Sequence, residues 1–236
     1  HVAENISLPG HTPLNKNESI QNSLIALQEE KSTEFFKVVT ADGIEMDGWM
    51  VKPTKFDSTK KYPVVFYVYT EPWGQEVTDT YGVSQNSLYA GDMRDDGYIY
   101  MCLDNRGTPV PKGREWRKAI HKKFGQVNIR DQAMAAKEIL KWKFVDADRI
   151  AVWGWSGGGA ATLNLMFQYP EIYKTGIAVS AVTNLLTYDN IYQERYMGLP
   201  QDNMEAYIKG SPLTHAKNLT GNLLYIHGTG DDNVHF

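Results

Sequence analysis

The chain has 236 residues, a formal net charge of −4 at pH 7, and 42% apolar and 22% charged residues, which is the composition of an ordinary globular protein. The acidic balance excludes the basic footprint of a nucleic-acid-binding protein, and no apolar run reaches the roughly 18 residues of a membrane span. A single cysteine, Cys102, excludes an internal disulfide and a C-x-x-C zinc site, and its apolar neighbours predict that it is buried.

The N-terminal part has the composition of a linker. Residues 1–17 contain glycine, proline and several asparagines, and Ser19–Glu30 has the apolar spacing of a short amphipathic helix. The N-terminus shows no signal-peptide pattern. The chain starts at His1 rather than Met, so we expect it to be a processed or excised piece of a longer protein.

The first predicted strands form a hairpin. Glu34–Val39 and Ile44–Lys52 are rich in β-forming residues, and Asp42-Gly43 lies between them. An Asp-Gly pair between two such runs is a strong hairpin signal, because glycine tolerates the positive φ of a tight turn.

Further along the chain, apolar strands alternate with helical segments. Strands are expected at Pro63–Tyr69, Gly97–Asp104, Ile150–Trp153, Gly176–Ser180 and Asn222–His227. Helices are expected at residues 80–95, Ile129–Trp142 and Ala160–Phe167. Strands that are apolar throughout belong to a sheet covered on both faces, and their alternation with helices predicts parallel pairing. The predicted fold is therefore α/β, with a mostly parallel central sheet, helices on both faces and an N-terminal β-hairpin.

The most informative motif is Gly154-Trp155-Ser156-Gly157-Gly158, a G-x-S-x-G pattern between a buried strand and an apolar helix. This is the pattern of the nucleophile elbow of α/β-hydrolases, which holds a serine hydroxyl clear of the sheet edge. The backbone N–H of Gly157, at the helix start, could donate to a developing oxyanion. The alternative is a Gly/Ser turn in a nucleotide-binding fold.

A catalytic acid and a histidine should follow this serine in the chain. Asp231 or Asp232, after the last strand, is the candidate acid, and the alternative for both is a solvated turn. His235 is the only histidine after these acids, and it is too close to them in sequence to reach both the acid and the serine. His227 precedes the acids and lies at the end of a strand. We therefore expect the general base to be missing, the chain to end before it, and these 236 residues to be nearly inactive.

Several motifs together resemble the dipeptidyl peptidase IV branch of the prolyl oligopeptidase family. They are Lys60–Pro63, Asp104–Gly107, Gly154–Gly158, Glu194–Pro200 and His227–Phe236. The resemblance implies an α/β-hydrolase catalytic domain over residues 34–236, incomplete at its C-terminus. It also implies that residues 1–33, with their linker and short helix, lead from an N-terminal β-propeller domain.

The resemblance also implies the roles of individual residues. Ser156 would be the nucleophile and Asp231 the triad carboxylate, with the Tyr69 hydroxyl and the Gly157 N–H as oxyanion donors. The implied substrate-binding residues are Tyr188, Tyr192, Val182, Val234, Asn233 and Arg195. No metal and no cofactor is implied, which agrees with acyl-enzyme chemistry by a serine.

By the same resemblance, the activity is that of a serine exopeptidase that removes N-terminal dipeptides after proline or alanine. The implied partners are such a peptide and a second copy of the hydrolase domain, and the implied location is periplasmic or extracellular, with the cytoplasm as an alternative. An esterase or an acylaminoacyl peptidase on the same scaffold, and a non-catalytic interaction domain, are the alternative functions.

Four positions depart from the family pattern. Thr70 and Glu71 stand where small residues are usual, and a carboxylate at Glu71 would raise the cost of an anionic intermediate. Gly157 replaces a frequent tyrosine, so we expect a wider pocket there, and Leu185 replaces a common aromatic residue.

Overall fold

The computed structural model describes residues 33–236, which form one compact unit. The linker and the helix expected at Ser19–Glu30 lie outside the described residues. The strands are β1 (Glu34–Val39), β2 (Glu45–Val51), β3 (Tyr62–Tyr67), β4 (Ile99–Leu103), β5 (Val145–Trp155), β6 (Thr175–Val179) and β7 (Asn222–Ile226). The helices are α2 (Gly113–Lys118), α3 (Val127–Ile139), α4 (Gly157–Gln168), α5 (Asn190–Met197) and α6 (Pro200–Gly210), with 3₁₀ turns η1 (Leu185–Thr187) and η2 (Pro212–Asn218).

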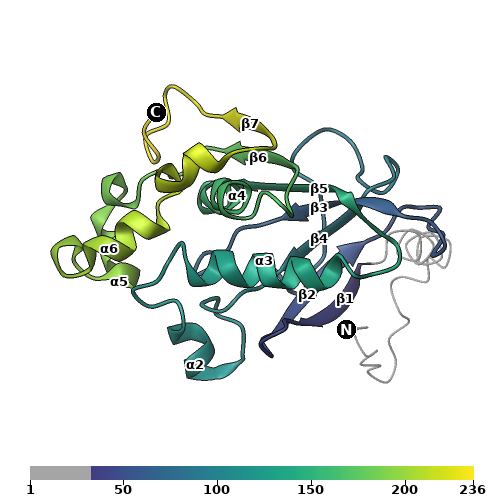
Figure 1. The fold of residues 1–236 in the computed structure, drawn as a ribbon, viewed down its shortest axis with the longest axis horizontal. Helices are drawn as coiled ribbons and strands as arrows, with labels where there is room; N and C mark the ends of the chain where they lie inside the picture. The colour runs from purple at the N-terminus through teal and green to yellow at the C-terminus, as the bar shows by residue number, and fades with distance from the viewer. Residues whose placement is uncertain (1–32) are drawn as a thin grey trace, which may run out of the picture. The chain divides into compact units, whose positions relative to one another are not determined.

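All of these strands belong to one sheet, in the order β1-β2-β4-β3-β5-β6-β7 (Figure 1). The pairs β1–β2 and β2–β4 are antiparallel and every other pair is parallel. The β1–β2 hairpin turns at Gly43, where φ is 84°. The predicted hairpin and the mostly parallel sheet are therefore confirmed.

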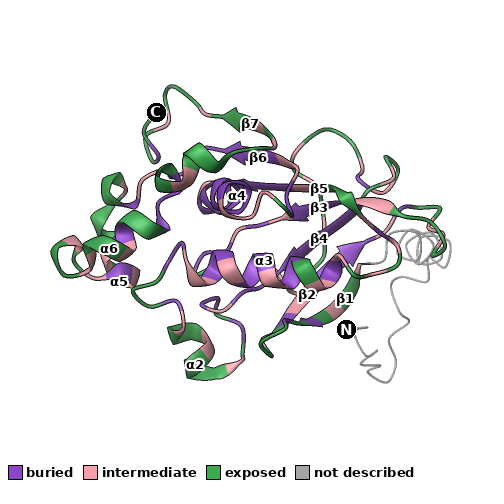
Figure 2. Cartoon of the chain, in the orientation of Figure 1, coloured by how far each residue is buried: buried purple, intermediate pink, exposed green. Residues whose placement is uncertain are grey.

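The inner strands of the sheet are buried on both faces, as their continuous apolar runs predict. On β3, Val64 and Phe66 face a core shared with α3 and α4, whereas Val65 faces a second core on the opposite side. Side chains alternate along a strand, so each apolar run serves both cores. Figure 2 shows the resulting contrast between α4, which is buried along its length, and β7, which is largely exposed at the sheet edge.

The helix expected at residues 80–95 was wrong, because this part of the described chain consists of turns. Gly82 has a φ of 82°, and the Asn86 side chain accepts from the Leu88 N–H at 2.8 Å. Such local bonds between an asparagine side chain and the backbone compete with a helix. The segment still covers the second face of the sheet, where Met93 is buried in that core.

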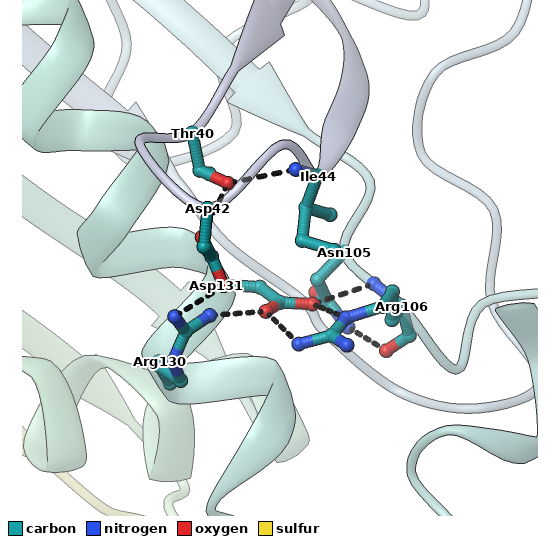
Figure 3. A network of polar contacts seen from close by, with 7 residues as sticks. All are labelled: Thr40, Asp42, Ile44, Asn105, Arg106, Arg130 and Asp131. Atoms are coloured by element: carbon teal, nitrogen blue, oxygen red, sulfur yellow. Dashed lines mark hydrogen bonds and ion pairs between the residues drawn. The ribbon is translucent and has the colours of Figure 1, made fainter.

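A buried carboxylate ties α3 to the loop after β4 and, indirectly, to the β1–β2 hairpin (Figure 3). Asp131 accepts from Nε and Nη2 of Arg106 at 2.8 and 2.7 Å, and from the Arg106 backbone N–H at 3.2 Å. Arg130 reaches Asp131 at 3.4 Å and the hairpin residue Asp42 at 2.6 Å. Bidentate arginine pairing of this kind satisfies a carboxylate that water cannot reach. Arg106, the arginine of the Asp104–Gly107 motif, therefore has a structural role.

Candidate active site

Ser156 lies at the junction of β5 and α4, with φ 58° and ψ −115°. This is the strained positive-φ turn between strand and helix that a nucleophile elbow requires, so the structure agrees with the G-x-S-x-G motif. A Cβ on Gly154 would meet the Val68 carbonyl oxygen at 2.4 Å, and one on Gly158 would meet it at 2.2 Å. The two glycines therefore let the end of β3 pack directly against the elbow.

Strained backbone gathers at the carboxyl edge of the sheet. Besides Ser156, Thr70 after β3 and Ser180 after β6 have positive φ values of 66° and 45°. Such conformations cost on the order of 1–3 kcal/mol each and persist only where surrounding structure holds them. In open α/β sheets this edge is also where ligands bind.

Two groups at this edge could hold a developing negative charge. Gly157 opens α4, so its N–H has no acceptor within the helix. Tyr69 follows β3 in a turn fixed by α3, because the Asn128 side-chain amide donates to the Thr70 hydroxyl at 3.0 Å. Burial raises the pKa of Tyr69, so its hydroxyl stays protonated and can donate.

A pocket of about 310 Å³ opens beside Ser156. It brings together residues that lie far apart in the chain, as expected for Tyr69, Tyr188 and Tyr192. Its lining is Tyr69, Glu71, Trp73, Phe124, Ser156, Gly157, Ala160, Val182, Leu185, Tyr188, Tyr192, Gln193 and Asn233. The Tyr188 hydroxyl donates to Asn233 Oδ1 at 2.9 Å, and the rings of Tyr188 and Tyr192 meet edge to face.

Three of the expected site residues do not line this pocket. Arg195 is exposed on α5, and Val234 is buried behind the pocket with Val182 and Leu185. Asp231 closes the turn after β7, where its Oδ1 accepts from the backbone N–H groups of Asn233 and Val234 at 3.1 and 3.0 Å. These backbone bonds lower the pKa of Asp231, which is therefore a carboxylate at neutral pH.

Neither C-terminal histidine contacts the serine. Nε2 of His227 donates to the Val234 carbonyl at 2.7 Å, and its Nδ1 lies 3.2 Å from the Tyr225 hydroxyl, so this ring is structural. His235 is exposed and lines a neighbouring cavity of about 400 Å³. Within residues 33–236, the Ser156 hydroxyl has no hydrogen bond to a histidine.

The space left by the missing side chain at Gly157 is not empty. A Cβ on Gly157 would lie 1.7 Å from Oε1 of Glu71, so the Glu71 side chain fills the space beside this glycine. Glu71 is only 4% exposed, and burial raises its pKa to about 8. Glu71 is therefore a neutral acid at pH 7, and the expected carboxylate charge beside the oxyanion donors is absent there.

Sequence reasoning missed other residues of the lining. Trp73 packs edge to face on Tyr69, with ring centroids 5.4 Å apart, and Gln193 is buried next to Tyr192 on α5. Phe124 arrives from the segment before α3. No motif marks these residues, whereas Glu71 was detectable as a departure from the family pattern.

Within the described part of the chain, no three His, Cys, Asp or Glu side chains are placed to bind a metal ion. No helix there is long and apolar enough to traverse a bilayer.

Comparison with known proteins agrees with this geometry. Residues 84–236 match the model of the prolyl oligopeptidase family. The chain is 37% identical to a probable dipeptidyl-aminopeptidase B of Trichophyton verrucosum, over 97% of this chain and 26% of the relative. It is 40% identical to a protein of the same description from Botryotinia fuckeliana, over 89% of this chain and 23% of the relative.

A solved structure gives the same result. The crystal structure of Porphyromonas gingivalis dipeptidyl peptidase 4 superposes with a TM-score of 0.81 at 37% identity, over 94% of this chain and 31% of that one. The chain thus spans about a quarter of the length of the curated relatives it matches. With an α/β-hydrolase fold and a serine in its elbow, the chain belongs to the prolyl oligopeptidase family of serine peptidases and resembles its dipeptidyl peptidase IV branch.

Proposed function

We propose that residues 34–236 form the catalytic domain of a serine exopeptidase that releases N-terminal dipeptides through an acyl-enzyme. The observation that carries the proposal is the placement of Ser156. Its elbow opens into a pocket that also contains Tyr69 and the first residue of α4, Gly157. This combines a nucleophile, two oxyanion donors and a site for a substrate side chain.

In the proposed mechanism, the Ser156 hydroxyl attacks the scissile carbonyl carbon while a general base takes its proton. The carbonyl oxygen becomes an oxyanion that accepts from the Gly157 N–H and the Tyr69 hydroxyl. The base then protonates the leaving amine, and water hydrolyses the ester on Ser156. The low pKa of Asp231 suits a carboxylate that would orient the base.

Specificity for proline or alanine is part of the proposal. Tyr188, Tyr192 and Val182 would form aromatic and apolar walls around the residue before the scissile bond, and Asn233 would hold a substrate carbonyl. Arg195 and Val234 would act from outside the lining, Val234 by packing behind Val182.

We also propose that residues 33–236 do not supply the general base. Both ring nitrogens of His227 have partners, and the exposed His235 has no bond to Ser156. The 236-residue chain should therefore react slowly with a fluorophosphonate, because losing one triad member removes most of the rate. Added imidazole should speed labelling, while His235→Ala should leave it unchanged. Fast labelling that is lost in His235→Ala would identify His235 as the base.

The reaction class is tested by turnover in the whole protein, including any sequence outside residues 1–236. A Gly-Pro chromogenic amide should be cleaved with release of the intact dipeptide, and a blocked N-acetyl-Gly-Pro amide should be a poor substrate. Cleavage of simple esters or of N-acylated peptides alone would favour the esterase or acylaminoacyl peptidase. Absence of both activities and of fluorophosphonate labelling would favour an interaction domain.

Three further expectations stay predictions: the β-propeller domain before residue 34, the homodimer, and the periplasmic or extracellular location. Analytical ultracentrifugation of the whole protein would test the dimer.

A further inference from the structure

The side chain of Glu71 occupies the space that a side chain at position 157 would need. A Cβ on Gly157 would lie 1.7, 2.4 and 2.7 Å from Oε1, Cδ and Cγ of Glu71, and these atoms would be its three nearest neighbours. All three distances are much shorter than an ordinary van der Waals contact of roughly 3.5–4.0 Å. A side chain at position 157 and the glutamate at position 71 therefore exclude each other.

The backbone does not require glycine at position 157. Gly157 is the first residue of α4 and, unlike Ser156 before it, does not have a positive φ. A residue with a side chain can adopt the helical conformation found there. The missing side chain at position 157 therefore matters only for the space that it leaves, and Glu71 fills that space.

The turn after β3 holds Glu71 in this place. The Thr70 hydroxyl accepts from the Asn128 side-chain amide at 3.0 Å, and the Glu71 carbonyl accepts from the Gly74 N–H at 3.1 Å. Glu71 itself is 4% exposed, and its carboxyl group takes part in no salt bridge or hydrogen bond within residues 33–236. Because packing rather than pairing holds this side chain, its volume is the property that acts on the site.

Glu71 is also part of the wall of the pocket beside Ser156. Glu71 and Gly157 both line this pocket, together with Tyr69 and Tyr188. Burial and then the nearby Glu71 carboxyl group raise the pKa of Tyr69 and of Tyr188, so Glu71 lies close to both rings. Burial raises the pKa of Glu71 to about 8, so at pH 7 this wall places no charge against an apolar substrate residue.

We propose that Glu71 sets the size limit of this pocket, so that it accepts proline or alanine before the scissile bond and excludes larger residues such as leucine. The inference rests on the proposed function, because it places the acyl residue of the substrate in the pocket beside Ser156. It assigns the limit to the turn after β3, although the missing side chain belongs to the elbow. Packed protein walls yield little, so a group a few atoms larger is excluded.

The first test enlarges the pocket. In the whole protein, Glu71→Ala should raise the kcat/KM of a Gly-Leu amide relative to that of a Gly-Pro amide by about tenfold or more, because one methylene in a pocket is worth about 10- to 200-fold. Glu71→Gln has nearly the same size and should keep the wild-type ratio. Gln75→Ala, at an exposed residue of the same loop that does not line the pocket, should also keep it.

The second test fills the space from the other side. Gly157→Ala places a methyl group where Glu71 lies, so it should lower the kcat/KM of the Gly-Pro amide by about tenfold, because overpacking forces the neighbouring groups to shift. In the Glu71→Ala background the same methyl group has room, so it should cost much less and should lower the Gly-Leu preference again. Urea unfolding of the two single variants and the double variant should show the same coupling without any need for turnover.

Two results would overturn the proposal. One is an unchanged ratio of Gly-Leu to Gly-Pro cleavage in folded Glu71→Ala. The other is a penalty for Gly157→Ala that is equal with and without the Glu71 side chain. If Glu71→Ala does not fold, Glu71→Thr, which keeps part of the side chain in the turn, gives the same comparison with a smaller increase in the ratio.

The comparison also remains possible if the proposed function is wrong. If esters are cleaved but dipeptide amides are not, 4-nitrophenyl acetate and pentanoate test the pocket size, and Glu71→Ala should raise the relative rate of the pentanoate. If nothing turns over, calorimetry should show that the wild type binds Gly-Pro about tenfold more tightly than Gly-Leu and that Glu71→Ala removes this difference. Equal ratios in wild type and Glu71→Ala would refute the inference in whichever assay applies.

Discussion

Asp131 and Glu71 are both buried acidic side chains, and they differ in what surrounds them. Asp131 is fully buried and accepts hydrogen bonds from two arginines and a backbone N–H (Figure 3). Glu71 is 4% exposed, faces a pocket and leaves Oε2 without a partner. The hydrogen bonds to Asp131 compensate for its loss of contact with water, whereas Glu71 has no such bonds within residues 33–236.

The difference separates a residue that holds the fold together from one that lines the pocket beside Ser156. The Asp131 cluster connects α3 with the loop after β4 and, through Arg130, with the hairpin turn at Asp42. The Glu71 pocket instead lies among turns with strained, positive-φ residues. Substitutions in the pocket should therefore alter turnover, and substitutions in the Asp131 network should alter the free energy of unfolding.

The largest expected effect is on turnover and comes from the pocket. In the whole protein, Ser156→Ala should lower kcat by about a millionfold, the scale on which serine peptidases depend on their nucleophile, and should abolish fluorophosphonate labelling. Removing this half-buried hydroxyl, which has no partner in residues 33–236, should leave the unfolding midpoint nearly unchanged. Substantial turnover in Ser156→Ala would contradict the proposed mechanism.

The next effect is that of an oxyanion donor. Tyr69→Phe should reduce kcat about 10²- to 10³-fold, because the phenol would no longer donate to the transition state. The ring would keep its edge-to-face packing on Trp73, so stability should change little. Steady-state kinetics should show the loss mainly in kcat. Trp73→Phe, which keeps an aromatic partner for Tyr69, is the control for changes in ring packing. A change confined to KM would place Tyr69 in binding only.

In the network, the expected effect is on stability. Asp131→Ala would leave Arg106 without its carboxylate, and breaking such a pair costs about 3 kcal/mol at the low end of the known range, because Arg106 is partly exposed. Urea unfolding of the chain measures this loss. Asp42→Ala, which removes an exposed partner of Arg130, should cost much less. Equal losses of unfolding free energy in Asp131→Ala and Asp42→Ala would mean that burial of the carboxylate does not decide how much it stabilises the fold.

Much of the fold was predictable because strand and hairpin signals are local. Glu34–Val39 is the observed β1, and the alternation of Val64, Val65 and Phe66 between two cores follows from the pleat. Residues 80–95 were expected to form a helix, but Gly82 and the Asn86 side-chain bonds favour turns. The spacing of apolar residues along the sequence does not reveal the conformation of Gly82 or the side-chain bonds of Asn86.

Site residues that belong to a sequence motif were predictable, whereas residues brought to the site only by packing were not. Ser156 and Gly157 stand out because the elbow requires glycines near a serine. That Glu71 occupies the space beside Gly157, or that Gln193 faces the same pocket, depends on contacts between segments about 80 to 120 residues apart in the chain. A single sequence shows the two departures at positions 71 and 157 but not that they compensate for each other.

Counted per pH unit, the smallest effect is the change in stability that comes from the titration of Glu71. Its pKa of about 8 in the folded chain exceeds the ordinary 4.5, so between these values the folded state holds a proton that the unfolded state has lost. Stability should therefore be greatest below about pH 4.5 and fall by about 1.4 kcal/mol per pH unit up to about pH 8. Glu71→Gln removes this proton, so its free energy of unfolding relative to wild type should rise steadily from pH 5 to 8 in urea titrations. The control is Asp42→Asn, at a carboxylate whose pKa is lowered by the Thr40 hydroxyl, and its curve should run parallel to that of the wild type over the same range. A parallel curve for Glu71→Gln as well would show that the Glu71 carboxyl is already ionised in the folded protein, and the contrast with Asp131 would then rest on missing hydrogen bonds alone.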